Sequence, residues 1–241
     1  MKKVAFIGCS YSAYEQTGQQ KNSWTWLLAQ RFPQHIYRNY ALGGRGPDYF
    51  RWALLDAKIW GADVVFVNST HSGRISFLVF EGQSLNENNT WKQEHISDNY
   101  STMIFLTPYV WIATGSANQM SITDNSSAFK NFKQHAVEYM STSQMLEQQQ
   151  IEWYSQVPHL YNFDDIFLLN FDKKCRDFSS THRKSVWETL MRVSGANSTR
   201  PQDLYPAGIC LSPTDDHWTP EGNKIVLEQY VLTPEVISAL S

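Results

Sequence analysis

A serine near the start of the chain and an Asp/His pair near its end have the residue types of a nucleophilic hydrolase. Ser10 lies in a Gly-Cys-Ser-Tyr-Ser run directly after the apolar residues 4–7, and Asp215 and His217 precede the last expected helix. A histidine can take the proton of a serine hydroxyl that attacks a carbonyl, while a carboxylate holds its other ring nitrogen. The order Ser…Asp…His therefore predicts acyl transfer, with Ser10 as nucleophile, His217 as base and Asp215 as its orienting group.

Acyl transfer also needs hydrogen-bond donors for the oxyanion that forms on the attacked carbonyl. The loops after the next two expected strands supply candidates. These are the backbone N–H groups of Gly43 or Gly44 and the side-chain amide of Asn68, which would act beside the N–H of Ser10. A glycine suits this role because its backbone can approach a ligand closely.

The residues after Asn68 and the aromatic content bear on what such a site would bind. His71 and Arg74 follow Asn68 and are candidates for contact with an anionic or sugar group, although a solvated loop pair explains them equally well. Nine Trp and twelve Tyr are more than a core of this size usually needs. The surplus either lines a groove for sugars or another flat ligand, or belongs to a heavily aromatic core.

Hydrophobic patterning predicts the elements that must position these residues. Strands are expected at 4–7, 35–40, 62–68, 165–171 and 209–211, and helices at 24–32, 48–60, 129–156, 180–194 and after Thr219. Ser23 and Thr219 have the types and positions of helix N-caps, and Pro158 is expected to end the long helix. Alternating strands and helices predict βαβ units and a parallel sheet with right-handed crossovers, whose carboxyl-end loops gather at one edge.

The middle of the chain is less regular. Residues 69–125 are polar and rich in Asn, Ser and Thr, with short apolar pieces at 75–80 and 103–114. We expect an insertion or lid over about residues 69–128 that carries little regular sheet, and a further loop at 200–206. A length of 241 residues fits one domain over 1–241 that includes this insertion.

The four blocks together resemble the SGNH or GDSL-type hydrolases. That family has Gly-Asp-Ser after the first strand, a glycine after the second, an Asn after the third and an Asp/His pair near the C-terminus. The matching residues are Gly8-Cys9-Ser10, Gly43 with Gly44, Asn68, and Asp215 with His217. The resemblance covers about residues 1–70 and 205–241. It implies an α/β fold, a flavodoxin-like three-layer α/β/α sandwich with a parallel sheet, and acyl transfer to water or a sugar.

Three positions depart from the family pattern. Cys9 stands where the family has Asp, and Phe66 stands where it has a glycine two residues before the Asn. The family's usual Asp-x-x-His spacing would put the acid at Thr214, whereas Asp215 lies two residues before His217. The block Asp-Asp-His-Trp-Thr-Pro-Glu-Gly is instead similar to that of SGNH-like polysaccharide O-acetyltransferases.

Charge, cysteines and motif spacing argue against several other classes. A net charge of −3 without a run of Lys or Arg argues against a nucleic-acid partner. Cys9, Cys175 and Cys210 fit no metal-ligand spacing and are expected as buried thiols, with one disulfide between two of them left open. The loop at 43–46 lacks the spacing of a phosphate fingerprint. We therefore expect no metal and no organic cofactor.

The apolar runs also bear on location. No window reaches the roughly 18 apolar residues of a membrane helix, and residues 4–7 are shorter than the apolar region of a signal peptide. We expect no membrane partner and a cytoplasmic location, with export by another route left open. The sequence does not fix an oligomeric state.

These observations predict a serine esterase or deacylase of the SGNH type that hydrolyses a short acyl ester, including O-acetyl groups on a carbohydrate. One alternative keeps the triad and transfers the acyl group to a carbohydrate hydroxyl, as the Asp-x-His-Trp-Thr-Pro block suggests. A second alternative is a non-catalytic, glycan-binding member of the same fold, suggested by Cys9, Phe66 and the unusual last block. Fold alone does not choose among the three.

Overall fold

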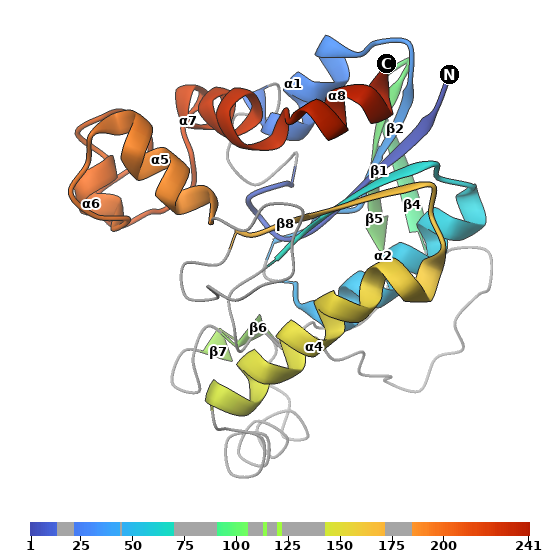
Figure 1. Cartoon of the computed structure of the whole chain (residues 1–241), viewed down its shortest axis with the longest axis horizontal. Coiled ribbons are helices and arrows are strands. Elements are labelled where there is room, and N and C mark those ends of the chain that lie inside the picture. Colours follow the sequence, from blue (N-terminus) through green and yellow to red (C-terminus); the bar gives the residue numbers. More distant parts are fainter. Residues whose placement is uncertain are drawn as a thin grey trace.

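A computed structural model describes residues 1–13, 22–43, 45–69, 91–105, 113–114, 120–121, 143–171 and 185–241 of the protein (Figure 1). His71, Arg74, Gly44 and Cys175 lie outside these residues, and so do the expected helix start at 129 and most of the 69–128 stretch.

A six-stranded sheet forms the centre of the molecule, in the order β4-β5-β2-β1-β3-β8. Its strands are β1 (Lys3–Ile7), β2 (Ile36–Asn39), β3 (Val64–Asn68), β4 (Trp91–Ser97), β5 (Tyr100–Phe105) and β8 (Asp165–Leu169). Each neighbouring pair from β5 to β8 is parallel, and β4 pairs antiparallel with β5 at the edge. The four long expected strands are thereby confirmed as β1, β2, β3 and β8.

The order of the strands places β1 near the centre of the sheet. β2 lies on one side of it and β3 on the other, and both pair parallel with β1. Ligands of open α/β sheets bind outside the carboxyl ends of the strands. Ser10 follows β1 and Asn68 ends β3, so both lie at this edge of the sheet.

Helices cover both faces of the sheet and give three layers (Figure 1). One face carries α1 (Trp24–Arg31), α7 (Pro220–Val226) and α8 (Pro234–Leu240), and the other carries α2 (Pro47–Trp60) and α4 (Ser143–Tyr161). The π-helix η2 (Leu227–Val231) joins α7 to α8, and α5 (Val186–Ser194) and α6 (Pro201–Leu204) lie together beyond the end of the sheet. This arrangement is the expected three-layer α/β/α sandwich.

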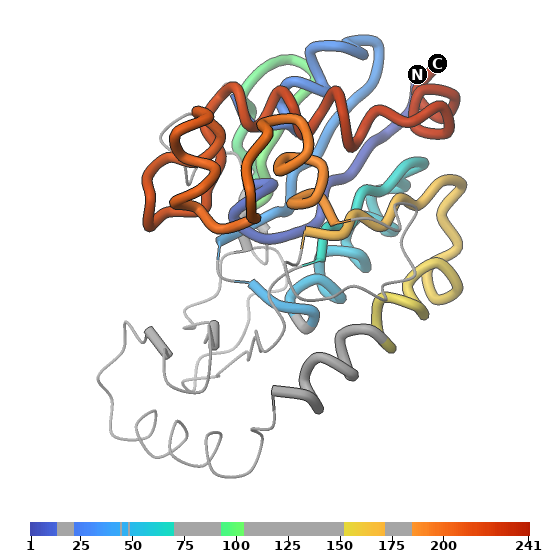
Figure 2. Tube along the Cα trace, turned by 60° about the vertical axis from the view of Figure 1, so that its left-hand side comes forward, coloured from blue at the N-terminus to red at the C-terminus, as the bar shows by residue number. Residues whose placement is uncertain are grey.

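Contacts within a few residues determine where several helices begin or end. The Ser23 hydroxyl accepts a hydrogen bond from the N–H of Trp26, and the Thr219 hydroxyl accepts one from Gly222, so both predicted N-caps are confirmed. Gly61 ends α2 with a φ of 78°, a left-handed conformation that a side chain disfavours. The two chain termini lie close together at the end of the molecule far from α5 (Figure 2).

The expectation that residues 69–128 carry little sheet is wrong for residues 91–105. They form β4 and β5, and β5 adds to the main sheet beside β2. The polar composition hides a strand because some of its buried positions carry polar side chains. The ring of Tyr100 lies 6.4 Å from that of Phe6, and the next two residues, Ser101 and Thr102, are buried with it. A separate pair of short strands, β6 (Ala113–Thr114) and β7 (Met120–Ser121), forms a second sheet.

Three other boundaries differ from expectation. Pro158 lies inside α4 and does not end it, because the buried side chains of Tyr154 and Val157 hold the helix on the protein through this turn. The expected loop at 200–206 contains the short helix α6, which starts at Pro201. The expected strand at 209–211 is one isolated bridge outside the main sheet.

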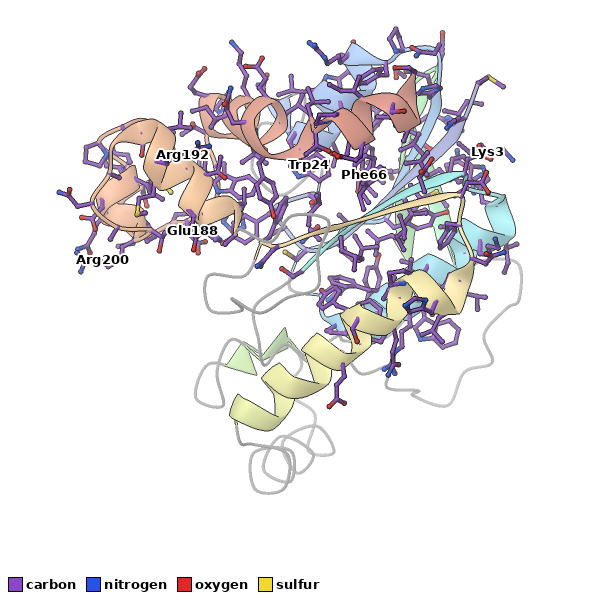
Figure 3. All side chains as sticks on the ribbon, viewed as in Figure 1. Lys3, Trp24, Phe66, Glu188, Arg192 and Arg200 are labelled. Atoms are coloured by element: carbon purple, nitrogen blue, oxygen red, sulfur yellow. The ribbon has the colours of Figure 1, made fainter. Side chains whose placement is uncertain are left out.

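Aromatic side chains fill the space between the sheet and the α1 layer. Phe66 stacks 5.1 Å from Phe167 and lies 5.6 Å from Phe6, with Trp24 edge-on at 6.0 Å (Figure 3). Phe66 is therefore a core residue. Trp24, Trp187 and Trp218 are all fully buried. For these three tryptophans the aromatic-core interpretation holds, and no helix in the described part of the chain is long and apolar enough to cross a bilayer.

Candidate active site

The proposed nucleophile sits in a tight turn that begins where β1 ends. The carbonyl of Cys9 accepts hydrogen bonds from the N–H groups of Ser12 at 3.0 Å and Ala13 at 3.1 Å. This turn stops the strand and brings Ser10 to the carboxyl edge of the sheet, where 5% of it is exposed. No hydrogen-bond partner for the Ser10 hydroxyl is found among the described residues. Attack by this hydroxyl on a substrate therefore requires no hydrogen bond to these residues to be broken.

Asn68 packs directly against the start of this turn. A Cβ placed on Gly8 would lie 1.4 Å from Oδ1 of Asn68, so only glycine fits there. The Asn68 side chain is 1% exposed and fully engaged: Oδ1 accepts from the Ser12 hydroxyl at 2.6 Å, and Nδ2 donates to the carbonyl of Ser69 at 2.8 Å and faces Cys9 Sγ at 3.5 Å. The strongest contacts of this amide are therefore internal.

The loop after β2 reaches the same place. The N–H of Leu42 donates to the carbonyl of Gly8 at 3.1 Å, which ties the residue before Gly43 to the nucleophile turn. Arg45 follows, with its guanidinium 5.8 Å from the ring of Tyr49, and burial lowers the pKa of Arg45 to about 10. Gly43 therefore lies at the predicted edge of the sheet, next to the residue that contacts the nucleophile turn.

The acid–base residues lie on a loop closed by a β-bridge. Cys210 and Trp218 pair antiparallel, the N–H of Leu211 donates to the carbonyl of His217 at 2.9 Å, and that of Thr219 donates to Ile209 at 2.9 Å. Within the loop, the Ser212 hydroxyl accepts the N–H groups of Thr214 at 3.2 Å and Asp215 at 3.0 Å. These local bonds set the backbone of residues 212–217 before any contact with the sheet is needed.

One carboxylate oxygen holds both the backbone and the ring of His217. Oδ1 of Asp215 lies 3.0 Å from the backbone N of His217 and 2.7 Å from its Nδ1. Since a carboxylate only accepts, Nδ1 carries the proton, and Nε2 of the neutral ring is then the acceptor. Nε2 is buried and has no hydrogen-bond partner among the described residues. The Asp-x-His spacing therefore forms the same pair that the longer family spacing implies.

Tyr11 connects the two halves of the site. Its ring lies 5.3 Å from that of His217 and stacks at 4.9 Å on Trp218, with Trp187 edge-on at 5.5 Å. Because Tyr11 directly follows Ser10, the nucleophile turn and the His217 loop are packed against each other. Tyr11 and Trp218 were not predicted as site residues. The only signal was that each adjoins a candidate triad residue.

Two cysteines and one acidic cluster are described near the site. Cys9 and Cys210 are buried free thiols, as expected, whereas Cys175 lies outside the described residues. In the part of the chain that the structure describes, Asp215, Asp216 and His217 bring ligand-type atoms within 4.8 Å of one another. The hydrogen bond between Asp215 and Nδ1 accounts for two of these three residues.

The comparisons with known proteins add a likeness of fold. No protein-family model matches the sequence, and no curated protein matches it. Among solved structures, one described as "Structure of a putative lipolytic protein of G-D-S-L family from Desulfitobacterium hafniense DCB-2" is similar over 100% of both chains, at 14% identity and a TM-score of 0.40. A TM-score this low does not indicate an activity. The fold is assigned from the sheet order and the three layers.

Proposed function

We propose that the protein is a serine hydrolase of carboxylic esters that works through Ser10, His217 and Asp215. The single observation that carries the proposal is the state of His217. Its Nδ1 is held 2.7 Å from Asp215, while Nε2 is buried and has no partner among the described residues. A buried ring nitrogen is normally paired, and one left open beside a candidate nucleophile turn is suited to receive a proton.

In the proposed reaction, the Ser10 hydroxyl attacks the ester carbonyl and its proton passes to Nε2 of His217. The imidazolium is stabilised by Asp215 and gives the proton to the leaving alcohol, which produces an acyl-enzyme. Water then attacks this ester with the same histidine as base, and the acid leaves with Ser10 restored. The N–H groups of Ser10 and Gly43 and the amide of Asn68 are the proposed oxyanion donors.

The surroundings favour a short acyl group. Ser10 is nearly buried, and bulky rings of Tyr11, Trp187 and Trp218 pack beside its turn. His71 and Arg74 stay candidates for contact with the alcohol part of the substrate. An acyl transfer to a carbohydrate hydroxyl would use the same first half-reaction, and a sugar acceptor that diverts product from the free acid would distinguish it from hydrolysis.

A non-catalytic binding protein on this fold is the second candidate. The observation that favours it is the engagement of Asn68, whose two amide hydrogens already face Ser69 and Cys9. If these contacts do not yield to an oxyanion, one of the three proposed donors is lost. Carbohydrate binding by a folded protein that hydrolyses no ester would support this candidate.

The test is hydrolysis of 4-nitrophenyl acetate, butyrate and octanoate by purified wild type, Ser10→Ala and His217→Ala. We expect the acetate to be the best substrate and each variant to lose about 10³-fold or more in kcat. Ser155→Ala, on the exposed face of α4, is the matched serine control and should keep wild-type rates. Full activity of Ser10→Ala on an ester that the wild type cleaves would overturn the proposal.

A further inference from the structure

A directed chain of three side chains runs through the core to Asn68. The indole Nε1 of Trp24, on α1, donates to the Ser12 hydroxyl at 3.1 Å, and that hydroxyl lies 2.6 Å from Oδ1 of Asn68. Trp24 and Asn68 are each 1% exposed and Ser12 is fully buried. Water therefore does not compete for these hydrogen bonds, and their direction is set by the three side chains alone.

The direction of this chain follows from the donor at its start. An indole N–H can only donate, so the Ser12 oxygen must accept from Trp24. The single hydroxyl hydrogen of Ser12 is then free to point at Asn68, and the atom that receives it must be the amide oxygen. If the Asn68 amide were turned over, its NH₂ group would face the hydroxyl, and the Ser12 hydrogen would have no acceptor there.

The fixed orientation leaves the NH₂ group of Asn68 facing Ser69 and Cys9, the residue before the proposed nucleophile. One hydrogen is donated to the carbonyl of Ser69 at 2.8 Å, while the other faces Cys9 Sγ at 3.5 Å. Sulfur is a weak acceptor, so this second hydrogen is the one that a stronger acceptor can take over. Cys9 directly precedes Ser10, and the displaceable hydrogen is therefore directed toward the turn that carries the proposed nucleophile.

Ser12 is itself held in place and cannot easily follow a moving amide. Its carbonyl accepts from Nδ2 of Asn39 at 2.7 Å, and its N–H donates to Cys9 within the turn. Asn39 Nδ2 also donates to the hydroxyl of Tyr100 at 2.8 Å. Through its carbonyl, Ser12 is therefore tied to Asn39 of β2, and through Asn39 to Tyr100 of β5.

We propose that Ser12 is a positioning residue that, directed by the Trp24 indole, holds the Asn68 amide with its NH₂ group toward the Cys9–Ser10 turn. The role rests on the proposed function, in which this NH₂ group stabilises the oxyanion. A turned-over amide would present its oxygen to the oxyanion and repel it. Ser12 therefore acts on the rate through Asn68 and does not touch the substrate.

A double-mutant cycle on ester hydrolysis tests this role. We expect Ser12→Ala to lower kcat about 10- to 100-fold with KM within about twofold, and Asn68→Ala to lower kcat at least as much. The double variant should be no worse than Asn68→Ala, because Ser12 has no effect without the amide. Additive losses in the cycle would overturn the proposal. Tyr37→Phe removes a hydroxyl that donates to the carbonyl of Phe32, outside the Ser12–Asn68 network, and should leave kcat unchanged.

A second measurement reads the orientation directly and does not depend on activity. In the ¹⁵N-edited NMR spectrum, the side-chain NH₂ hydrogens of Asn68 should show contacts to the Cys9 β-hydrogens in wild type and lose them in Ser12→Ala. If Ser12→Ala does not fold, Trp24→Phe removes the direction-setting donor and keeps the hydroxyl, and it should weaken the same contacts. Unchanged contacts in a folded variant would overturn the proposal. A wild type that shows these contacts but cleaves no ester would instead contradict the proposed function and leave the orientation intact.

Discussion

The two halves of the candidate site are held by opposite kinds of contact. The hydrogen bond between Ser12 and Asn68 joins residues 56 positions apart, whereas the one between Asp215 and His217 joins residues two positions apart. The first pair is buried almost completely, but the side chains of Asp215 and His217 are 46% and 30% exposed. The nucleophile half is therefore part of the core, and the acid–base half is a locally closed loop placed against it.

This difference predicts which substitutions lower both the stability and the catalytic rate, and which lower the rate alone. A change in the nucleophile half disturbs contacts between β1, β2, β3 and α1 at once, so stability and rate should fall together. A change in the 209–219 loop alters contacts that are mostly internal to that loop, so the rate can fall while the fold remains.

Gly8→Ala should have the largest effect. The added Cβ would lie 1.4 Å from Oδ1 and 2.3 Å from Cγ of Asn68, so the amide or the strand end must move. We expect a loss of about 3 kcal/mol or more in the free energy of unfolding, above the usual range for overpacking because a buried amide loses its partners as well. Urea unfolding and ester hydrolysis should show both losses together.

The matched control is Gly195→Ala, which places a Cβ in open space at the end of α5. Its φ of 70° costs about 1–2 kcal/mol for any side chain, but activity should be unaffected. A Gly8→Ala protein as stable as this control would show that the nucleophile turn is not tied to the core as described.

Asp215→Asn should separate rate from stability. The amide keeps an oxygen for the backbone N–H of His217, but it no longer stabilises the imidazolium or enforces the tautomer. We expect kcat to fall about 10²- to 10⁴-fold, while the free energy of unfolding changes by less than about 1 kcal/mol because the pair is half-exposed. Asp216→Asn, one residue away, should keep kcat within about threefold. Equal losses in the two variants would remove Asp215 from the triad.

Ser212→Ala should have a smaller effect on the same loop. The variant loses the side-chain acceptor for the N–H groups of Thr214 and Asp215, which loosens the turn that presents the carboxylate, and Asp215 keeps only the carbonyl of Ser212 at 3.3 Å. We expect a kcat about three- to tenfold lower, an unchanged KM and a stability loss of about 1 kcal/mol or less. A thermal melt beside steady-state kinetics measures both. A loss of several kcal/mol would mean that this loop, too, is part of the core.

Much of the fold was predictable from the sequence because its signals are local. The fully apolar runs at residues 4–7 and 64–67 became the central strands β1 and β3. Ser23 and Thr219 became the N-caps of α1 and α7, since a capping hydroxyl acts within three residues. The pairing of Asp215 with His217 is equally local, and the short spacing did not prevent it.

The unpredicted features depend on contacts between distant segments. Nothing near residues 91–105 indicates that β5 adds to the edge of β2, because that pairing is decided by the free edge of another strand. The roles of Ser12 and Trp24 depend on a bond to Asn68 that no spacing within the chain encodes. Pro158 continues α4 because buried neighbours outweigh its missing N–H, which local propensity does not include.

Covalent labelling with a fluorophosphonate probe, followed by mass spectrometry of the modified peptide, tests whether His217 activates Ser10. The probe should attach to Ser10 in wild type and in Asp216→Asn. Labelling should be lower by about 10²-fold or more in His217→Ala, and absent at this position in Ser10→Ala. A folded wild type that is not labelled, or a label that persists in Ser10→Ala, would contradict the assignment of Ser10 as a nucleophile activated by His217.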